Sequence, residues 1–216
     1  MTMFTPDQVR QSMRLYAITD DSWLHGRSIA DCVADALAGG ATCVQLREKQ
    51  GCTPKAADTA RALRGLCRQA GVPFIVNDYV GLAREVDADG VHVGQEDMAC
   101  EGARRLLGPG KIVGVSVGTC EEALAAQAAG ADYLGAGAVF PTPTKPESVA
   151  LGIEALKAIC SAVSIPVVAV GGMGLETIPQ LAGTGVSGIA VVSAIFAQDD
   201  IIGATKGLYK ATKALW

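Results

Sequence analysis

The sequence predicts one (β/α)8 barrel, an α/β fold forming a single compact domain over residues 1–216. Short apolar runs alternate with longer segments that carry helix signals, and there are eight such runs. The runs are rich in Val, Ile and Leu, which is typical of strands covered on both faces. An open doubly wound sheet is the rival arrangement, but it would carry a Gly-rich dinucleotide-binding sequence near its first strand, and none is present.

The expected strands lie in regular order along the chain. They are Arg14–Thr19, Thr42–Arg47, Pro73–Asn77, Gly90–Val93, Ile112–Ser116, Tyr133–Ala138, Pro166–Val170 and Gly188–Val192. No Pro- or Ser-rich linker divides them, which favours one domain.

Helix start and stop signals fill the intervals between the strands. A short helix at about residues 5–13 should begin at Thr5-Pro6, and another helix at Thr53-Pro54, because each pair offers an N-cap followed by Pro. Thr119-Cys120-Glu121-Glu122 has the form of a capping box. Left-handed residues are expected to end three helices, at Gly39, Gly71 and Gly130.

Composition limits the classes of partner and compartment. The net charge is −4, with acidic and basic residues interspersed, so neither nucleic acid nor an anionic membrane is an expected partner. The start of the chain has no apolar secretory signal and no segment reaches a membrane-spanning length, so we expect a cytoplasmic protein. Seven cysteines without a CxxC pair are typical of reduced thiols.

One face of the second strand is polar. In the stretch ATCVQLREK, successive side chains point to opposite faces, so Gln45, Arg47 and Lys49 share one face while Val44 and Leu46 share the other. In a barrel the polar row would point inward near the carboxyl end of its strand, where barrels place their active sites. Cations at that position cost free energy unless an anion meets them, so we expect an anionic ligand.

Polar and flexible residues also follow the other strands. Asp78 and Asp97 end adjacent strands and suit Mg²⁺, which proteins typically hold with one or two carboxylates and substrate phosphates. The alternative is that both aspartates cap the helices that follow. Lys145 would add a third cation, and the turns at Gly171–Gly174 and Val192-Ser193 lie where barrels bind phosphate, although the glycines also fit an ordinary turn.

The reactants and the reaction type follow from these groups. Two anion sites indicate two phosphorylated reactants, or one reactant with two phosphates. No general base is conspicuous, since the chain has only two histidines, and His92 has no second metal ligand beside it. These features favour a nucleophile with no proton to lose and a phosphate or pyrophosphate leaving group.

Eight motifs in strand order make the resemblance specific. They are LYAITD, VQLREK, FIVNDY, GVHVGQED, GVSVGT, FPTPTK, VVAVGG and AVVSAI. Together they resemble the thiamine-phosphate synthase family over nearly the whole chain. The resemblance implies a (β/α)8 transferase that uses Mg²⁺ to join 4-amino-2-methyl-5-hydroxymethylpyrimidine diphosphate to 4-methyl-5-(2-phosphoethyl)thiazole, or its carboxylated form. The products would be thiamine phosphate and pyrophosphate.

The resemblance also implies roles for individual residues. Arg47, Lys49 and Lys145 would be catalytic, and Asp78 and Asp97 would bind the metal, with Asp97 preferred over Glu96 on the family alone. The implied substrate-binding residues are Gln45, Leu46, Arg47, Glu48, Lys49, Asn77, Ser116, Thr142, Pro143, Thr144, Lys145, Gly172, Val192 and Ser193. Thr119 stands where the family often has a histidine, and Met173 replaces the usual Ile of its GGI turn.

Two alternatives remain open from the sequence. A thiazole tautomerase-like paralogue shares this fold but not the diphosphate cations with both metal carboxylates, and a non-catalytic barrel that senses phosphorylated ligands would need no turnover. Small-molecule substrates are the expected partners, and the sequence leaves a homo-oligomer open. Two segments are candidates for a closing loop, Gln50–Thr53 and Pro141–Val149.

Overall fold

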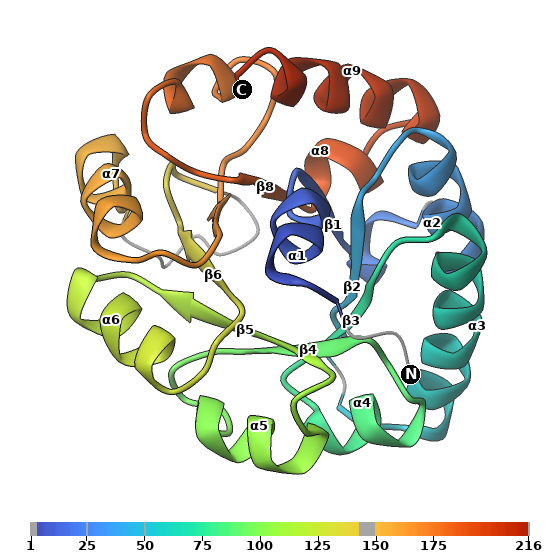
Figure 1. Ribbon diagram of the computed structural model, residues 1–216. Coiled ribbons are helices and arrows are strands. Elements are labelled where there is room, and N and C mark those ends of the chain that lie inside the picture. Colours follow the sequence, from blue (N-terminus) through green and yellow to red (C-terminus); the bar gives the residue numbers. More distant parts are fainter. Residues whose placement is uncertain (1–3, 25, 50, 143–149, 216) are drawn as a thin grey trace.

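Eight parallel strands close into a barrel in the computed structural model, which describes residues 4–24, 26–49, 51–142 and 150–215 (Figure 1). The strands are β1 Leu15–Ile18, β2 Cys43–Leu46, β3 Phe74–Asn77, β4 Gly90–Val93, β5 Ile112–Val117, β6 Tyr133–Gly137, β7 Val167–Val170 and β8 Gly188–Val191. Each strand pairs with its neighbours along the chain, and β8 pairs with β1. The predicted (β/α)8 barrel is confirmed, with strand bounds within one or two residues of those expected.

Helices surround the barrel in the order of the chain. They are α1 Pro6–Ser12, α2 Ile29–Ala38, α3 Pro54–Ala70, α4 Val80–Glu85, α5 Cys100–Leu107, α6 Cys120–Ala128, α7 Ile153–Ala162, α8 Ser193–Phe196 and α9 Ile201–Lys213, with 3-10 helices η1 Asp21–Trp23 and η2 Ile178–Leu181. The connection from β7 to β8 therefore carries the short η2, and no α-helix is present among its residues.

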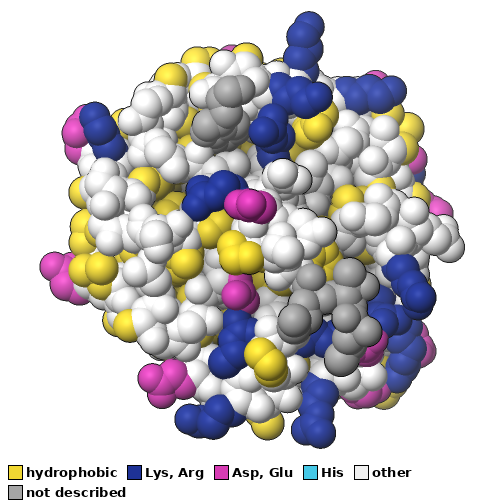
Figure 2. Space-filling model, viewed as in Figure 1, with side chains coloured by type: hydrophobic (Ala, Val, Ile, Leu, Met, Phe, Trp, Pro, Cys, Tyr) yellow, Lys and Arg dark blue, Asp and Glu magenta, His cyan; other side chains and the backbone are white. Residues whose placement is uncertain are grey.

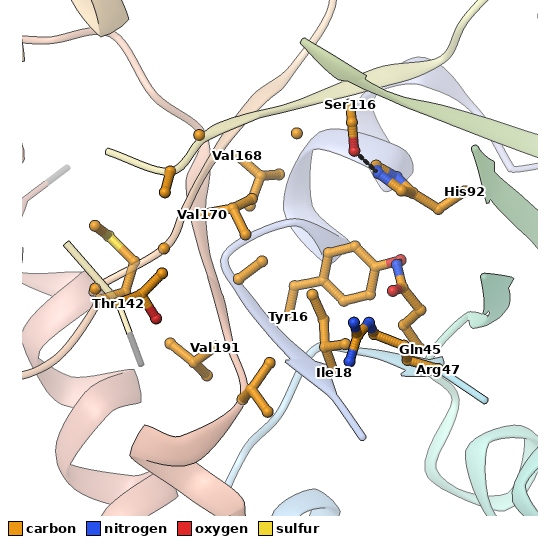
Figure 3. A pocket seen from close by; sticks show the side chains of 18 of the residues that line it. Tyr16, Ile18, Gln45, Arg47, His92, Ser116, Thr142, Val168, Val170 and Val191 are labelled. Atoms are coloured by element: carbon orange, nitrogen blue, oxygen red, sulfur yellow. Dashed lines mark hydrogen bonds between the residues drawn. The ribbon is translucent and has the colours of Figure 1, made fainter. Parts of the chain in front are cut away.

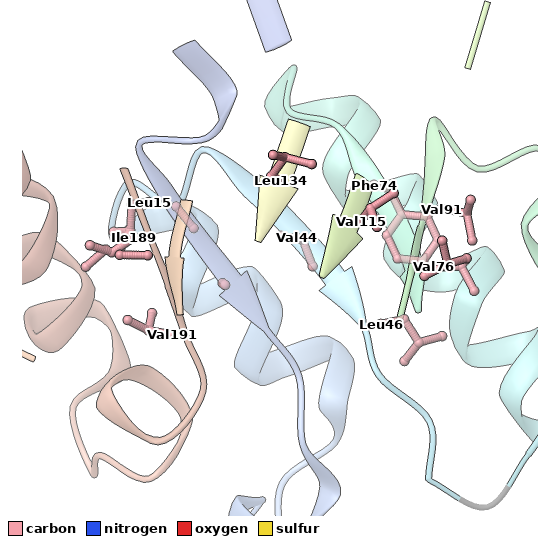
Figure 4. Close-up of a cluster of buried hydrophobic side chains, with 14 of the residues drawn as sticks. Leu15, Val44, Leu46, Phe74, Val76, Val91, Val115, Leu134, Ile189 and Val191 are labelled. Atoms are coloured by element: carbon pink, nitrogen blue, oxygen red, sulfur yellow. The ribbon is translucent and has the colours of Figure 1, made fainter. Parts of the chain in front are cut away.

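Strand side chains divide between two apolar layers, as the alternation in the sequence predicts. Val44 and Leu46 are buried between β2 and the surrounding helices, as are Phe74 and Val76 of β3 (Figure 4). Cys43 belongs to a separate buried cluster inside the barrel. Parity along each strand thus decides which side chains reach the barrel interior.

Helix α1 covers the amino-terminal end of the barrel and lies across its centre in Figure 1. Val9 and Met13 are buried in the interior cluster of the barrel. Arg10 donates to the Ser187 hydroxyl and to the Ser164 carbonyl, at 2.9 and 3.0 Å, in the segments just before β8 and β7. Ligands therefore meet the barrel from its carboxyl end.

The predicted N-caps are present, with one difference. The hydroxyls of Thr5 and Thr53 each accept a hydrogen bond from the first turn of their helix, and Pro follows both. Thr119 likewise accepts from the Glu122 N–H. The Glu122 carboxylate, however, accepts from the Gly118 N–H at 2.6 Å, so it reaches one residue beyond the N-cap.

The helix-end glycines were only partly predicted. Gly71 and Gly130 adopt positive φ angles of 70° and 88°. Gly39 was predicted wrongly, because its φ is −78° and Gly40 takes the left-handed position at 103°. Gly39 instead allows close packing, since a Cβ there would lie 2.5 Å from the Cβ of Thr205 on α9.

The surface around α1 mixes basic, acidic and apolar side chains over the described residues (Figure 2). No helix among the described residues is both long and apolar enough to cross a membrane. All seven cysteines are free thiols, as expected.

Candidate active site

A cavity of about 450 Å³ opens at the carboxyl end of the barrel (Figure 3). Side chains and backbone from β1, β2 and β4–β8, with Asn77 at the end of β3, line it. Of the predicted site residues, it gathers Gln45, Arg47, Asn77, Ser116, Thr142, Gly172, Val192 and Ser193. In Figure 3, Arg47 and Thr142 lie on different sides of this cavity.

A carboxylate holds the two cations of the VQLREK motif. Asp20, two residues after the end of β1, is only 2% exposed. One of its oxygens lies 2.7 Å from the Lys49 ammonium and 3.3 Å from the Arg47 guanidinium. Burial opposes ionisation of Asp20, but hydrogen bonds from Lys49 and Ser22 outweigh it and lower the pKa of this carboxyl.

The role of Asp20 was not predicted from the sequence. The expectation that an anionic ligand would meet these cations is incomplete, because Asp20 already lies against both. The last residue of LYAITD was an available signal, since the end of β1 is beside the end of β2 in a barrel. Arg47 lines the cavity, whereas Lys49 lies outside its lining and has a side chain that is 41% exposed.

The two aspartates predicted as metal ligands follow neighbouring strands. The Asp78 N–H donates to the His92 carbonyl at 2.8 Å, and the Asp78 carboxylate accepts from the Asn77 amide at 2.6 Å. The Asp97 carboxylate accepts from the Gly94 N–H at 2.7 Å. Neither caps a helix, because the N-cap residues of α4 and α5 are Tyr79 and Ala99. The helix-cap alternative is therefore wrong.

A chain of hydrogen bonds crosses the barrel beneath the mouth. The Gln45 amide donates to the Tyr16 hydroxyl at 2.8 Å, and the Tyr16 and Tyr133 hydroxyls are 2.8 Å apart. His92 Nδ1 lies 2.9 Å from the Tyr133 hydroxyl, and His92 Nε2 lies 2.9 Å from the Ser116 hydroxyl. All five side chains line the cavity.

Tyr16 and Tyr133 were missed in the sequence. Strand parity, which places His92 inward, also places both tyrosines inward.

The remaining predicted residues fall in three places. The Leu46 side chain is buried between β2 and the helices, and Leu46 lies outside the cavity lining (Figure 4). Glu48 is half-buried and lies outside the cavity lining. Pro143, Thr144 and Lys145 lie outside the described residues, as do Gln50 and residues 143–149 of the two candidate closing loops.

Comparisons with known proteins identify the family. A family model described as thiamine monophosphate synthase matches residues 15–195. The chain belongs to the thiamine monophosphate synthase family. Its members are enzymes of thiamine biosynthesis in the transferase class, and so is this chain.

Two bacterial relatives match along nearly their whole length. A thiamine-phosphate synthase of Clostridium novyi is 47% identical over 196 residues, covering 90% of this chain and 96% of the relative. One from Chloroflexus aurantiacus is 50% identical and covers 90% of both chains. A solved structure of thiamine phosphate pyrophosphorylase from Pyrococcus furiosus is 42% identical with a TM-score of 0.89, over 96% of this chain and 98% of that one.

Proposed function

We propose that this enzyme condenses an aminopyrimidine methyl diphosphate with a thiazole phosphate, giving thiamine phosphate and pyrophosphate. The observation that carries the proposal is the distribution of groups around one mouth. Arg47 with Lys49 and the Asp78 and Asp97 carboxylates follow β2, β3 and β4, whereas Gly172, Val192 and Ser193 follow β7 and β8. Two separate anion sites suit two phosphorylated reactants.

The diphosphate would bind at the cations of β2. Arg47 has a planar guanidinium with several donors, of which one lies toward Asp20, and it lines the cavity. Lys49 adds a point charge beside it. Negative charge builds up on the leaving diphosphate as the carbon–oxygen bond breaks, so fixed cations at this position stabilise the transition state more than the ground state.

Mg²⁺ fits the acidic groups of β3 and β4. Among the described residues, no three His, Cys, Asp or Glu side chains lie together as a complete metal cage. Mg²⁺ does not need one, since it is usually bound by one or two carboxylates together with substrate phosphates. Asp78 and Asp97 would supply those carboxylates, and the metal would supply charge neutralisation for the departing pyrophosphate.

The second reactant would bind beside β7 and β8. Gly172 lines the cavity with backbone atoms alone. Its φ is 68°, and a Cβ there would lie 2.6 Å from the Phe140 Cβ and 2.8 Å from the Pro141 carbonyl oxygen, so a side chain does not fit. Val192 and Ser193 begin α8 in the same wall. A phosphate held here would direct the thiazole nitrogen toward the pyrimidine methylene.

The chain's contribution to catalysis is mainly position and charge. The thiazole nitrogen carries no proton, so its attack on the methylene needs no general base. Both ring nitrogens of His92 already have hydrogen-bond partners within the barrel, which agrees with that absence. Holding both rings in one cavity would make their reaction effectively unimolecular. Arg47 and Lys49 would favour dissociative loss of pyrophosphate.

Pyrophosphate release tests the proposal. The protein is incubated with both substrates and Mg²⁺, and pyrophosphate and thiamine phosphate are measured together. Equal release of both products is expected. Binding without turnover would favour the sensor barrel, and isomerisation of a thiazole substrate without pyrophosphate release would favour the tautomerase-like alternative.

A substitution of Arg47 tests the diphosphate site directly. Arg47→Ala should lower kcat/KM by about 100-fold or more, by analogy with removal of one preorganised donor. The fold should survive, because Lys49 still pairs with Asp20. Arg61→Ala on the exposed face of α3 is the matched control and should turn over as the parent does. Parent-like turnover in Arg47→Ala would contradict the assigned role.

A further inference from the structure

The hydrogen-bonded chain in the barrel links two of the predicted substrate-binding residues. Gln45 lies at one end and Ser116 at the other, with Tyr16, Tyr133 and His92 between them. They come from five strands, β2, β5, β1, β6 and β4 respectively. The exposed fractions of Tyr16 and Tyr133 are 1% and 0%, so no solvent intervenes at the centre of the chain.

One assignment of the protons gives every hydroxyl proton between Gln45 and His92 an oxygen or nitrogen acceptor. The Gln45 amide nitrogen donates to the Tyr16 oxygen, so the single Tyr16 proton is available to the Tyr133 oxygen. The Tyr133 proton is then directed at His92 Nδ1. In this assignment His92 carries its proton on Nε2 and donates it to the Ser116 oxygen.

Burial of the two tyrosines supports this assignment of the protons. It raises the pKa of both phenols well above the ordinary value, so each keeps its proton at neutral pH. No buried side-chain nitrogen or oxygen among the described residues lacks a hydrogen-bond partner. If the link between Tyr16 and Tyr133 were reversed, the Tyr16 oxygen would accept from both Gln45 and Tyr133, and the buried Tyr16 proton would lose its oxygen acceptor.

The two ends of the chain consequently present opposite groups to the cavity. Gln45 keeps its amide oxygen, an acceptor, and Ser116 keeps its hydroxyl proton, a donor. We propose that Tyr133 and His92 are positioning residues that fix this polarity, so that the site selects a heterocycle with an amino donor and a ring-nitrogen acceptor over its oxo counterpart. This deepens the proposed function and rests on it for the identity of the ring.

The oxo counterpart would meet the wrong group at the amide end. An exocyclic carbonyl in place of the amino group would oppose the Gln45 oxygen, leaving two acceptors facing each other. Sites built to hydrogen-bond one polar group reject an analogue that lacks it because their own groups are left unpaired. Turning the Gln45 amide would bring its nitrogen to the exocyclic carbonyl. The hydrogen-bonded chain opposes this rotation, because the turned amide could no longer donate to Tyr16.

The tautomer of His92 can be measured without any substrate. Long-range ¹H–¹⁵N correlation spectra of the whole, ligand-free protein distinguish protonated from unprotonated ring nitrogens. The chain has only two histidines, so the signals that disappear in His92→Asn assign the ring. We expect a neutral ring with the proton on Nε2. A proton on Nδ1, or on both nitrogens, would overturn the proposal whether or not the enzyme turns over as proposed.

Tyr133→Phe then tests whether Tyr133 fixes the tautomer of His92 and the substrate preference. It removes one hydroxyl from the chain, and we expect a mixture of His92 tautomers. Preference for the amino over the oxo pyrimidine diphosphate, measured as a ratio of kcat/KM values, should fall about tenfold. Ile75→Val is the control, because it removes one methyl group from the same barrel interior and should leave tautomer and preference unchanged.

Two results of this second experiment would contradict the proposal. They are an unchanged tautomer with an unchanged preference in Tyr133→Phe, and an equal loss of preference in Ile75→Val. If Tyr133→Phe does not fold, the wild-type spectrum still decides the tautomer. A wild type with the expected tautomer but no pyrophosphate release would refute the proposed function while leaving the chain polarity intact.

Discussion

The carboxylate between β1 and β2 permits a quantitative test of how the site is held together. In Asp20→Asn the side chain keeps its shape, and its oxygen can still accept the hydrogen bond from the Ser22 N–H, which is 2.9 Å long in the parent. The negative charge is lost, and an amide nitrogen replaces the oxygen that faces Arg47 and Lys49. Arg47 and Lys49 would then lie beside each other without the anion that both contact.

The expected destabilisation is about 1–3 kcal/mol at neutral pH. Removing one partner of a buried pair costs about 3–5 kcal/mol. The loss expected for Asp20→Asn is smaller than this, because the side chains of Arg47 and Lys49 are 22% and 41% exposed and can be hydrated by water. The Asp20 side chain is only 2% exposed.

The pH dependence has a definite sign. The folded-state pKa of Asp20 is lowered, so its contribution to stability is complete above the unfolded-state value of about 3.9 and is lost as pH falls through the folded-state pKa. The stability difference between parent and Asp20→Asn should therefore be constant from about pH 5 to 7 and should narrow below about pH 4.

Urea unfolding of both proteins over this pH range measures the difference. Asp21→Asn is the matched control, because Asp21 is an exposed neighbour, and its effect should stay within about 0.5 kcal/mol. A destabilisation by Asp20→Asn no larger than that of the control would refute the reasoning. A difference that does not narrow in acid would refute the assignment of the charge to Asp20.

Three further substitutions, one of them with a matched control, test the barrel and the metal site. Gly188→Ala should lower the free energy of unfolding in urea by about 3 kcal/mol or more, because its Cβ would lie 2.0 Å from the Met13 carbonyl oxygen. Gly65→Ala on the open side of α3 is the control and should raise the free energy of unfolding by up to about 1 kcal/mol. Equal effects of the two substitutions would contradict the packing at Gly188. Thr53→Ala should lower the free energy of unfolding by about 1 kcal/mol through loss of the α3 cap, and an unchanged urea midpoint would contradict this. Asp78→Asn, which tolerates the φ of 62°, should raise the Mg²⁺ concentration for half-maximal turnover about tenfold, and an unchanged Mg²⁺ titration would remove Asp78 from the metal site.

Sequence reasoning predicts the barrel well because its signals are local. Each strand is a short apolar run covered on both sides, and period-two alternation separates Val44 and Leu46 from Gln45 and Arg47 without knowledge of any neighbour. The same reasoning finds the Thr5 and Thr53 caps, since a cap and its acceptor lie within one turn.

Contacts between distant strands are harder to predict. The pairing of Asp20 with Lys49 depends on the relative height of two strand ends, and alternation gives the face but not the height. The choice between Gly39 and Gly40 depended on α9, because only Gly39 lies against Thr205. The link between Tyr16 and Tyr133 spans 117 residues, so no local pattern contains it.

Helix α1 has a consequence for the order of events. It closes the amino-terminal end of the barrel. In the part of the chain described here, reactants and products would therefore share the opening at the carboxyl end. If the pyrimidine binds at the depth of Tyr16, the thiazole would lie between it and this opening. We therefore expect ordered binding, with the pyrimidine diphosphate first.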